Sequence, residues 1–319
     1  MQYAIAAEPA VIDLNNDGFA DVIYIGDAGG QMWKWDIHAV GSLTAGTVPT
    51  SVWPVGMMFQ APVATIASGT KHYHSIFQAA AAAFEGNNLW LSFGSGERMD
   101  LGYTGAPNAT DPNAIEGQYD DNNRLWVMED LHPTGVGAFP TSLPIEEEPA
   151  AAGHQGLTDI TNTMRDGDPN DAGYFFRVPE GEKFITDQII FGGVAATLAY
   201  QPDIAGSGSN NDCALGGTTF EFAWELQNGV GVLMGSDSSS GGSGGSGTPN
   251  GSGVTETGIR SEAKGDGAPT NPRVTISIDQ NGAVKVDPMV QTSTGELQHL
   301  DGLPSGFDPV DMIFWRQDF

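Results

Sequence analysis

The chain has 319 residues, with 12 Lys and Arg against 40 Asp and Glu, a formal net charge of −28 and a mean hydropathy of −0.20. Nucleic acids and anionic membranes are bound by clustered Lys and Arg, so a basic binding surface for either is excluded. The longest apolar run, Ala79–Phe84, is far shorter than the ~20 residues of a transmembrane helix, so no membrane span is expected. The 44 glycines disfavour long helices and favour short strands joined by turns.

Strands are expected along the whole chain, because apolar and polar residues alternate and helical periods do not recur. Alanine favours helix, but five residues are too few for a stable helix, so Ala79–Ala83 is assigned to a strand. Gln280-Asn281-Gly282 predicts a hairpin turn. In chain order, the expected strands are Val22–Ile25, Gln31–Ile37, Ala79–Ala83, Leu89–Phe93, Arg124–Met128, Ile189–Gly192, Phe220–Leu226, Val274–Ile278 and Met312–Trp315.

These strands fall into four groups, and each group ends near an aromatic-rich strand that is expected to close it. An aromatic closing strand that recurs roughly every 50–80 residues predicts an all-β fold, a partial β-propeller of about four blades. Two polar stretches rich in Gly, Pro and Asp, Met99–Asn122 and Ser142–Ala172, are expected to be long surface insertions. The four groups are Tyr3–Pro62, Ile76–Leu131, Tyr174–Leu226 and Arg273–Trp315.

The expected division of the chain has three parts. Residues 1–234 should form propeller blades, with a calcium hairpin at 13–21, and residues 254–319 the last blade and its closing strand. Between them, Gly235–Gly253 has the composition of a flexible linker, which cannot form a core. Residues 2–12 lack the features of a signal peptide, so Met1 is expected to begin a processed chain or a fragment.

The sharpest motif is the loop Asp13-Leu14-Asn15-Asn16-Asp17-Gly18-Phe19-Ala20-Asp21. Side-chain oxygens stand at loop positions 1, 3, 5 and 9, and a glycine at position 6 permits the sharp turn, a spacing typical of calcium loops. Its flanks are strand-like and Tyr24 replaces the final Glu of an EF-hand, so the loop is expected inside a hairpin, with Asp21 bidentate. The alternative is a turn without metal. The predicted ligands are Asp13, Asn15, Asp17, the Phe19 carbonyl and Asp21.

Other candidate sites are weaker. Asp166–Asp171 is acidic but irregular, so a solvated loop is preferred to a second cation site; Asp120–Asn123 is expected to be a turn. His72 and His74 share one face of an extended segment, where a surface or packing role is preferred to zinc binding. Cys213 has no partner for an internal disulfide. The sequence contains no G-x-S-x-G, H-E-x-x-H or phosphate-loop motif, so no enzymatic activity is expected.

Residues Asp13–Ile37 resemble the calcium hairpin and following strand of the C-terminal β-propeller in the PilC/PilY family of type IV pilus tip adhesins. The family propeller is larger than four strand groups, so the resemblance implies that this chain corresponds to its C-terminal portion. The family often pairs the cysteine near position 213, and no second cysteine occurs here. Further segments resemble the family in the same order: Leu91–Glu97 with Asn123–Asp130, Gly181–Thr197, Asp212–Glu225 and Phe314–Arg316.

The resemblance implies a non-enzymatic, calcium-binding factor in type IV pilus biogenesis and surface attachment. The implied partners are minor pilins and a host or abiotic surface. The implied location is the pilus tip or outer cell surface, after transit through the periplasm. Two other classes stay open. A quinoprotein-like propeller enzyme would need a cofactor pocket of stacked Trp and basic residues. An FG-GAP-like binding module would repeat the D-x-N-x-D-G-x-x-D loop in every blade, and the loop occurs once.

Deletion of Gly235–Gly253 is expected to shift the melting temperature by less than about 4 °C, the shift that ~1 kcal/mol produces in a domain of this size. The reason is that a flexible loop changes closure entropy only with the logarithm of its length. Differential scanning fluorimetry of the deleted and intact chains measures the shift. A fall of many degrees would contradict the linker assignment.

Overall fold

The structure is a computed structural model. It describes residues 2–38, 53–65, 71–85, 88–97, 122–134, 144–147, 155–163, 165, 172–179, 181–202, 216–233, 260–278, 284–295 and 297–301. Every regular element in these ranges is a β-strand, so the all-β prediction is confirmed for the described residues. The same ranges contain no helix that is long and apolar enough to cross a membrane.

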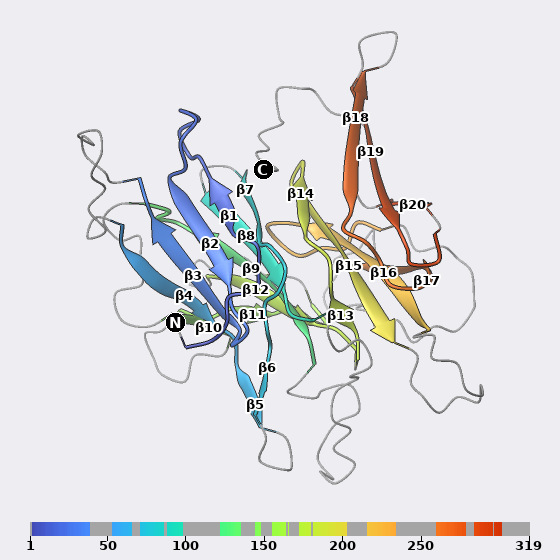
Figure 1. Cartoon of the computed structure of the whole chain (residues 1–319), viewed down its shortest axis with the longest axis horizontal. Coiled ribbons are helices and arrows are strands. Elements are labelled where there is room, and N and C mark those ends of the chain that lie inside the picture. Colours follow the sequence, from blue (N-terminus) through green and yellow to red (C-terminus); the bar gives the residue numbers. More distant parts are fainter. Residues whose placement is uncertain are drawn as a thin grey trace.

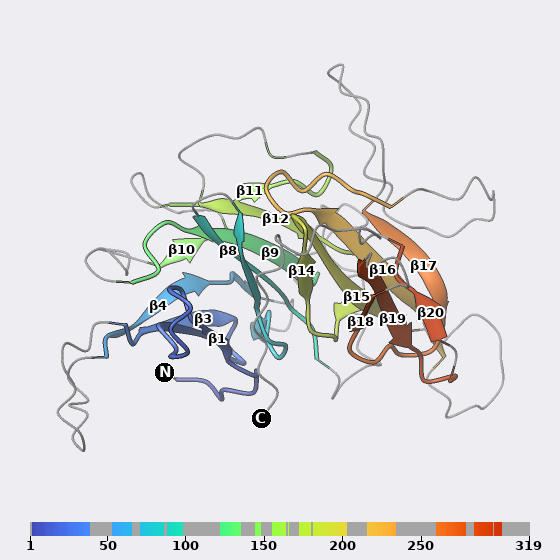
Figure 2. The ribbon, with the colours of Figure 1, turned by 90° about the horizontal axis from the view of Figure 1, so that it is seen from above.

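In the described part of the chain, four β-sheets of three or more strands lie one after another, and a fifth sheet is a two-stranded hairpin (Figures 1 and 2). The first sheet has the strand order β1-β2-β3-β4-β10, and the second has the order β11-β12-β9-β8-β7. The third is β13-β15-β16-β17 with β14 also paired to β15, and the fourth is β18-β19-β20. Neighbouring strands are antiparallel, except that β10 lies parallel to β4 and β11 parallel to β12.

The strands are short, as the glycine content predicts. Those of the first sheet are β1 (Ala10–Ile12), β2 (Val22–Gly26), β3 (Gln31–Asp36), β4 (Val55–Gln60) and β10 (Ile145–Glu146). Those of the second are β7 (Ala81–Glu85), β8 (Asn88–Gly94), β9 (Arg124–Asp130), β11 (Thr158–Asp159) and β12 (Gly173–Arg177). Those of the third are β13 (Lys183–Phe184), β14 (Ile189–Phe191), β15 (Val194–Pro202), β16 (Gly217–Glu225) and β17 (Ser261–Asp266). Those of the fourth are β18 (Arg273–Ile278), β19 (Val284–Gln291) and β20 (Leu297–His299); β5 (Val63–Thr65) and β6 (Lys71–Tyr73) form a separate hairpin.

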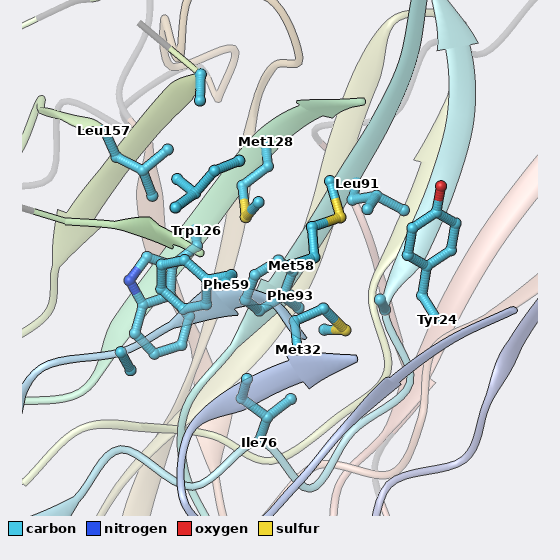
Figure 3. Packing of buried hydrophobic residues seen from close by; sticks show 14 of the residues in the cluster. Tyr24, Met32, Met58, Phe59, Ile76, Leu91, Phe93, Trp126, Met128 and Leu157 are labelled. Atoms are coloured by element: carbon cyan, nitrogen blue, oxygen red, sulfur yellow. The ribbon is translucent and has the colours of Figure 1, made fainter. Parts of the chain in front are cut away.

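The sheets pack face to face, and the second sheet is covered on both sides. Successive side chains of a strand point to opposite faces, so β9 serves two cores at once. Trp126 and Met128 lie in the cluster shared with Met32 and Phe59 of the first sheet (Figure 3). The intervening Leu125 and Val127 lie in a second cluster. Its partners from the third sheet are Phe184, Ile190, Ala195, Ala199, Phe222 and Trp224.

The third and fourth sheets share a smaller contact, in which Leu198 of β15 packs with Val290 of β19 and with Leu300. Antiparallel sheets stacked in chain order are arranged like the blades of a β-propeller. The described residues do not trace a closed ring, so the structure supports a propeller-like stack and leaves closure undefined.

Most of the expected strands are present. β2, β3, β8, β9, β14, β16 and β18 confirm strands expected from the sequence, and Ala79–Ala83 corresponds to β7, which begins two residues later. Several predictions lie outside the described residues and keep their status as predictions: the Gln280–Gly282 turn, the Gly235–Gly253 linker, the boundaries at 234 and 254, and the strand at Met312–Trp315.

The expected strand grouping was wrong in two respects. The aromatic strands β3, β9 and β16 do not close their sheets, because β4, β12 and β17 pair with their outer edges. An inner position gives a strand a hydrogen-bonded neighbour at each of its two edges, so these aromatic strands lie within their sheets. In addition, Tyr174 was expected to open the third group, yet β12 completes the second sheet. The stretch Ser142–Ala172 also supplies the edge strands β10 and β11 rather than surface loops alone.

A buried ion pair connects the first two sheets. Lys34 of β3 is 0% exposed, and its Nζ lies 2.6 Å from Oδ2 of Asp130 at the end of β9. The Tyr24 hydroxyl donates to the same oxygen at 2.6 Å, and Nζ also donates to the His132 carbonyl at 2.8 Å. Burial lowers the pKa of Lys34, and the charge of Asp130 offsets part of that effect. The pair therefore has to stay intact, since either charge alone would be buried without compensation.

Lys34→Met is expected to lower the free energy of unfolding by about 3–5 kcal/mol, because Asp130 would keep a buried charge without its cation. The double variant Lys34→Met/Asp130→Asn should recover at least half of that loss, since it leaves no buried charge. Urea unfolding of the three chains measures both values. A loss below about 1 kcal/mol in the single variant, the range of an exposed pair, would be inconsistent with a buried one.

Candidate metal centre

The loop of residues 13–21 connects β1 to β2 and folds back on itself at two positions. Asn16 has a φ of 59° and Gly18 a φ of 88°, both in the left-handed region. Asparagine and glycine are the residues that enter this region most readily. The strands on either side hold the base of the loop, where the Asp21 N–H donates to the Ile12 carbonyl at 2.8 Å. The prediction of a loop within a hairpin is therefore confirmed.

The Asp13 carboxylate is the hub of this loop. It accepts backbone N–H groups from Asn15 at 3.2 Å, Asp17 at 3.3 Å and Gly18 at 2.7 Å. Desolvation alone would raise the pKa of Asp13, but the backbone N–H groups of Gly18 and its neighbours together lower it. Asp13 is therefore held ionised inside a curve of the backbone.

The side chains of Asn15 and Asp17 also accept backbone N–H groups within the loop. Oδ1 of Asn15 accepts the Asp17 N–H at 2.9 Å, and Oδ1 of Asp17 accepts the Phe19 N–H at 2.9 Å. These contacts over two residues are local to the loop and support its turns. The side chain of Phe19 is 76% exposed.

Asp21 lies at the base of the loop and is only 4% exposed. Its Oδ2 accepts the Leu14 N–H at 2.7 Å, and its Oδ1 lies 2.7 Å from Nδ1 of His38. The hydrogen bond to Asp21 raises the pKa of His38, and the charges of Asp21, Asp36 and Asp17 act in the same direction. His38 follows β3 and meets the loop through strand pairing, so no local motif singles it out.

The oxygen donors fit calcium in kind. Three carboxylates, one amide and one carbonyl on a short loop are the hard ligands that calcium prefers. In the described conformation, however, Asp13 turns to the loop backbone and Asp21 to His38. Among the described residues, no three His, Cys, Asp or Glu side chains gather in a metal-binding arrangement. The predicted ligands Asp13, Asn15, Asp17, Phe19 and Asp21 share one loop, and calcium binding remains a prediction.

The other candidates are placed as follows. His74 is fully buried beside Trp126, with ring centroids 6.5 Å apart, so its packing role is confirmed. The side chains of Asn122 and Asn123 donate to the Val178 and Glu182 carbonyls. Cys213 and the acidic cluster Asp166–Asp171 lie outside the described residues.

Sequence reasoning missed a buried polar network around Arg124. Its Nε lies 3.0 Å from Oε2 of Glu147, an ion pair whose angle does not make a hydrogen bond. Its Nη1 donates to the Asn122 carbonyl at 3.0 Å, and Trp126 Nε1 donates to Oε1 of Glu147 at 2.6 Å. Burial raises the pKa of Glu147 to about 7, although Arg124 and Trp126 favour its charged form. The network joins β9 to the segment after β10.

Glu182, immediately before β13, is a buried carboxyl of a different kind. It is 3% exposed, and its Oε1 has no hydrogen-bond partner among the described residues. Its backbone is fixed, since its N–H donates to the Pro179 carbonyl at 3.1 Å and its carbonyl accepts Asn123 Nδ2 at 2.8 Å. Burial alone raises the pKa of Glu182 to about 8, so the folded chain holds this group protonated at neutral pH.

The free energy of unfolding is expected to fall as pH rises from about 4.5 to about 8, because folded Glu182 keeps a proton that the unfolded chain releases. A shift of roughly 3.5 pKa units sets an upper limit of about 5 kcal/mol on this loss. Glu182→Gln should remove most of the loss, with a smaller part remaining from Glu147. Urea unfolding at several pH values tests this, with Glu225→Gln on the surface as control. An unchanged pH dependence in Glu182→Gln would refute the assignment.

Comparison with known proteins gives a likeness of fold. No protein-family model matches the sequence, and no curated protein matches it. Among solved structures, the chain is similar to the crystal structure of the Pseudomonas aeruginosa PilY1 C-terminal domain, with a TM-score of 0.54 and 17% sequence identity. The match covers 93% of this chain and 60% of that one, so this chain spans less than two thirds of its neighbour. The chain has a fold like that of the PilY1 C-terminal domain.

Proposed function

We propose that this chain is a PilY1-like, non-enzymatic component of type IV pili that binds calcium and acts in pilus assembly and surface attachment. Its partners in this proposal are minor pilins and a host or abiotic surface. Its place is the pilus tip or outer cell surface, reached through the periplasm.

The observation that carries the proposal is the fold likeness, which extends over 93% of the chain. The resemblance of Asp13–Ile37 to the PilC/PilY calcium hairpin points the same way, and this segment forms β2, β3 and the loop before them. Two separate features, an overall fold and a local motif, thus agree on one family. The quinoprotein-like and FG-GAP-like alternatives have no comparable support.

Calcium in this proposal is held by Asp13, Asn15, Asp17, the Phe19 carbonyl and Asp21. The ion supplies positive charge to a loop that carries three carboxylates. The chain itself supplies the frame, because Gly18 and Asn16 curve the backbone and strand pairing anchors Asp21. A cation on this loop would tie β1 to β2 at the end of the first sheet and link the ion to the stack of sheets.

Calcium is expected to raise the melting temperature of the chain, because an ion that binds only the folded state adds about 2.7 kcal/mol at 100 times its Kd. Asp17→Ala should remove most of this rise, since it deletes a ligand. In chelator its stability should equal or exceed that of the parent chain, because one repelling charge is lost. Thermal melts in calcium and in chelator measure the effect.

Asp159→Ala is the matched control. Asp159 is also an exposed aspartate whose Oδ1 accepts an N–H two residues ahead, from Thr161 at 2.9 Å, just as Asp17 accepts from Phe19. It should keep the full calcium response. A parent chain that ignores calcium, or an Asp17→Ala variant with the full response, would show that this loop is not the site.

Pilus association is tested separately by pull-down of minor pilins with the chain in calcium and in chelator. Capture that weakens in chelator and in Asp17→Ala, but not in Asp159→Ala, is the expected result. Capture under neither condition would count against the pilus assignment and leave the calcium result standing by itself.

A further inference from the structure

The amine of Lys34 and the carboxyl group of Asp130 meet in a site that is closed to solvent. Lys34 of β3 is 0% exposed, and Asp130 at the end of β9 is 6% exposed. Nζ of Lys34 lies 2.6 Å from Oδ2 of Asp130. Oδ2 is bonded directly to the carboxyl carbon Cγ, so the amine nitrogen lies within about 4 Å of that carbon. An amine and a carboxyl carbon are thus held near the separation of reacting atoms, which is about 3–3.5 Å.

Hydrogen-bond donors reach both oxygens of the Asp130 carboxyl group. The Tyr24 hydroxyl donates to Oδ2 at 2.6 Å, and the His132 backbone N–H donates to Oδ1 at 3.1 Å. When an amine adds to Cγ, negative charge develops on these oxygens, and donors that are already in place stabilise it. The His132 carbonyl accepts Nζ of Lys34 at 2.8 Å and orients the amine. The site therefore combines a nucleophile, a carboxyl carbon and donors for the developing charge.

Burial also favours the reactive form of the amine. A lysine is nucleophilic only when it is deprotonated, and desolvation disfavours its charged form. Burial lowers the pKa of Lys34, although the charges of Asp130 and Asp36 act in the opposite direction. One proton that moves from Nζ to Oδ2 along their hydrogen bond converts the ion pair into a neutral amine and a neutral carboxylic acid. In a desolvated site these neutral forms avoid the cost of burying two charges.

We propose that Lys34 and Asp130 form a modification site, at which they condense to an intramolecular amide that links β3 of the first sheet to β9 of the second. The ion pair is the state before reaction. Nζ forms a bond to Cγ of Asp130, and the bond from Cγ to Oδ2 then breaks. Oδ2 leaves as water, with the proton that it received from Nζ and a second proton that Nζ loses on bond formation. Tyr24 contacts the departing oxygen and donates to it as it leaves. The reaction needs no oxidant and no cofactor.

A second lysine–aspartate pair among the described residues is equally close but lies in different surroundings. Nζ of Lys264 lies 2.5 Å from Oδ2 of Asp301, whose side chain is 62% exposed. Burial alone would lower the pKa of Lys264, but its hydrogen bond to Asp301 and the charge of Glu221 together raise it. This amine is held in its charged form and water reaches its partner, so the pair should stay ionic. At Lys34 both conditions are reversed, and a neutral amide would replace two buried charges.

Mass spectrometry of the 319-residue chain, folded and then denatured, tests the proposal. Most of the chain should weigh one water molecule less than its sequence mass. Trypsin should not cleave after Lys34, because an acylated lysine is no longer its substrate. The digest should contain a branched peptide that joins the segment around Lys34 to the segment around Asp130. Lys264 and Asp301 are the matched control in the same digest and should occur only in linear peptides.

Two variants complete the test. Lys34→Arg keeps a cation beside Asp130 but removes the nucleophile, so it should have its full sequence mass. Tyr24→Phe keeps the ring and should slow amide formation at least tenfold, measured as the linked fraction at successive times after synthesis. A parent chain of full sequence mass, or one in which the Lys34 peptide is linear, overturns the proposal. A water loss that persists in Lys34→Arg overturns it too, since that loss arises elsewhere, as by cyclisation at Asp17-Gly18.

Discussion

Burial of apolar strand faces between successive sheets is the constraint on which the rest of the structure depends. Each sheet alone is too small to bury both of its faces, so it is stable only against a neighbour. The second sheet satisfies this requirement on both sides through the alternating residues of β9. Lys34 and Asp130 form a buried ion pair in the interface between the first and second sheets. Because separating this ion pair would leave a buried charge unpaired, the pair favours one position of the first sheet against the second.

The candidate metal loop is connected to the Lys34–Asp130 ion pair through a short row of ionisable side chains. Asp21 contacts His38, whose backbone N–H donates to Asp36, and Asp36 shares the buried face of β3 with Lys34. The row runs from the loop to the contact between sheets, where the charges of Asp130 and Asp36 both act on Lys34. It connects the proposed calcium site physically with the groups that hold the first sheet in place.

Local features of the sequence predicted the parts of this structure that local chemistry determines. Alternation identified β8, β16 and β18, and the Asp, Asn and Gly spacing identified the loop at 13–21. β17 escaped prediction because its residues, Ser261–Asp266, are mostly polar and become a strand only by pairing with β16. The contact of Arg124 with Glu147 joins residues far apart in sequence. The side chain of Trp35 points away from the second sheet. The sequence of a single strand cannot specify which of its two faces will pack against a neighbouring sheet.

β12 pairs with β9 although a long stretch of chain separates the two strands, and this has a consequence for the order in which the chain folds. The hairpins β2–β3, β7–β8 and β15–β14 join near neighbours and close with little loss of chain entropy. β9, in contrast, receives its second partner only when residues 173–177 arrive, about 40 residues later along the chain. During synthesis its edge is an open row of backbone donors and acceptors on a strand that carries the apolar run Leu125–Met128. The nascent chain is thus most vulnerable to misassociation in the interval between the emergence of β9 and that of β12.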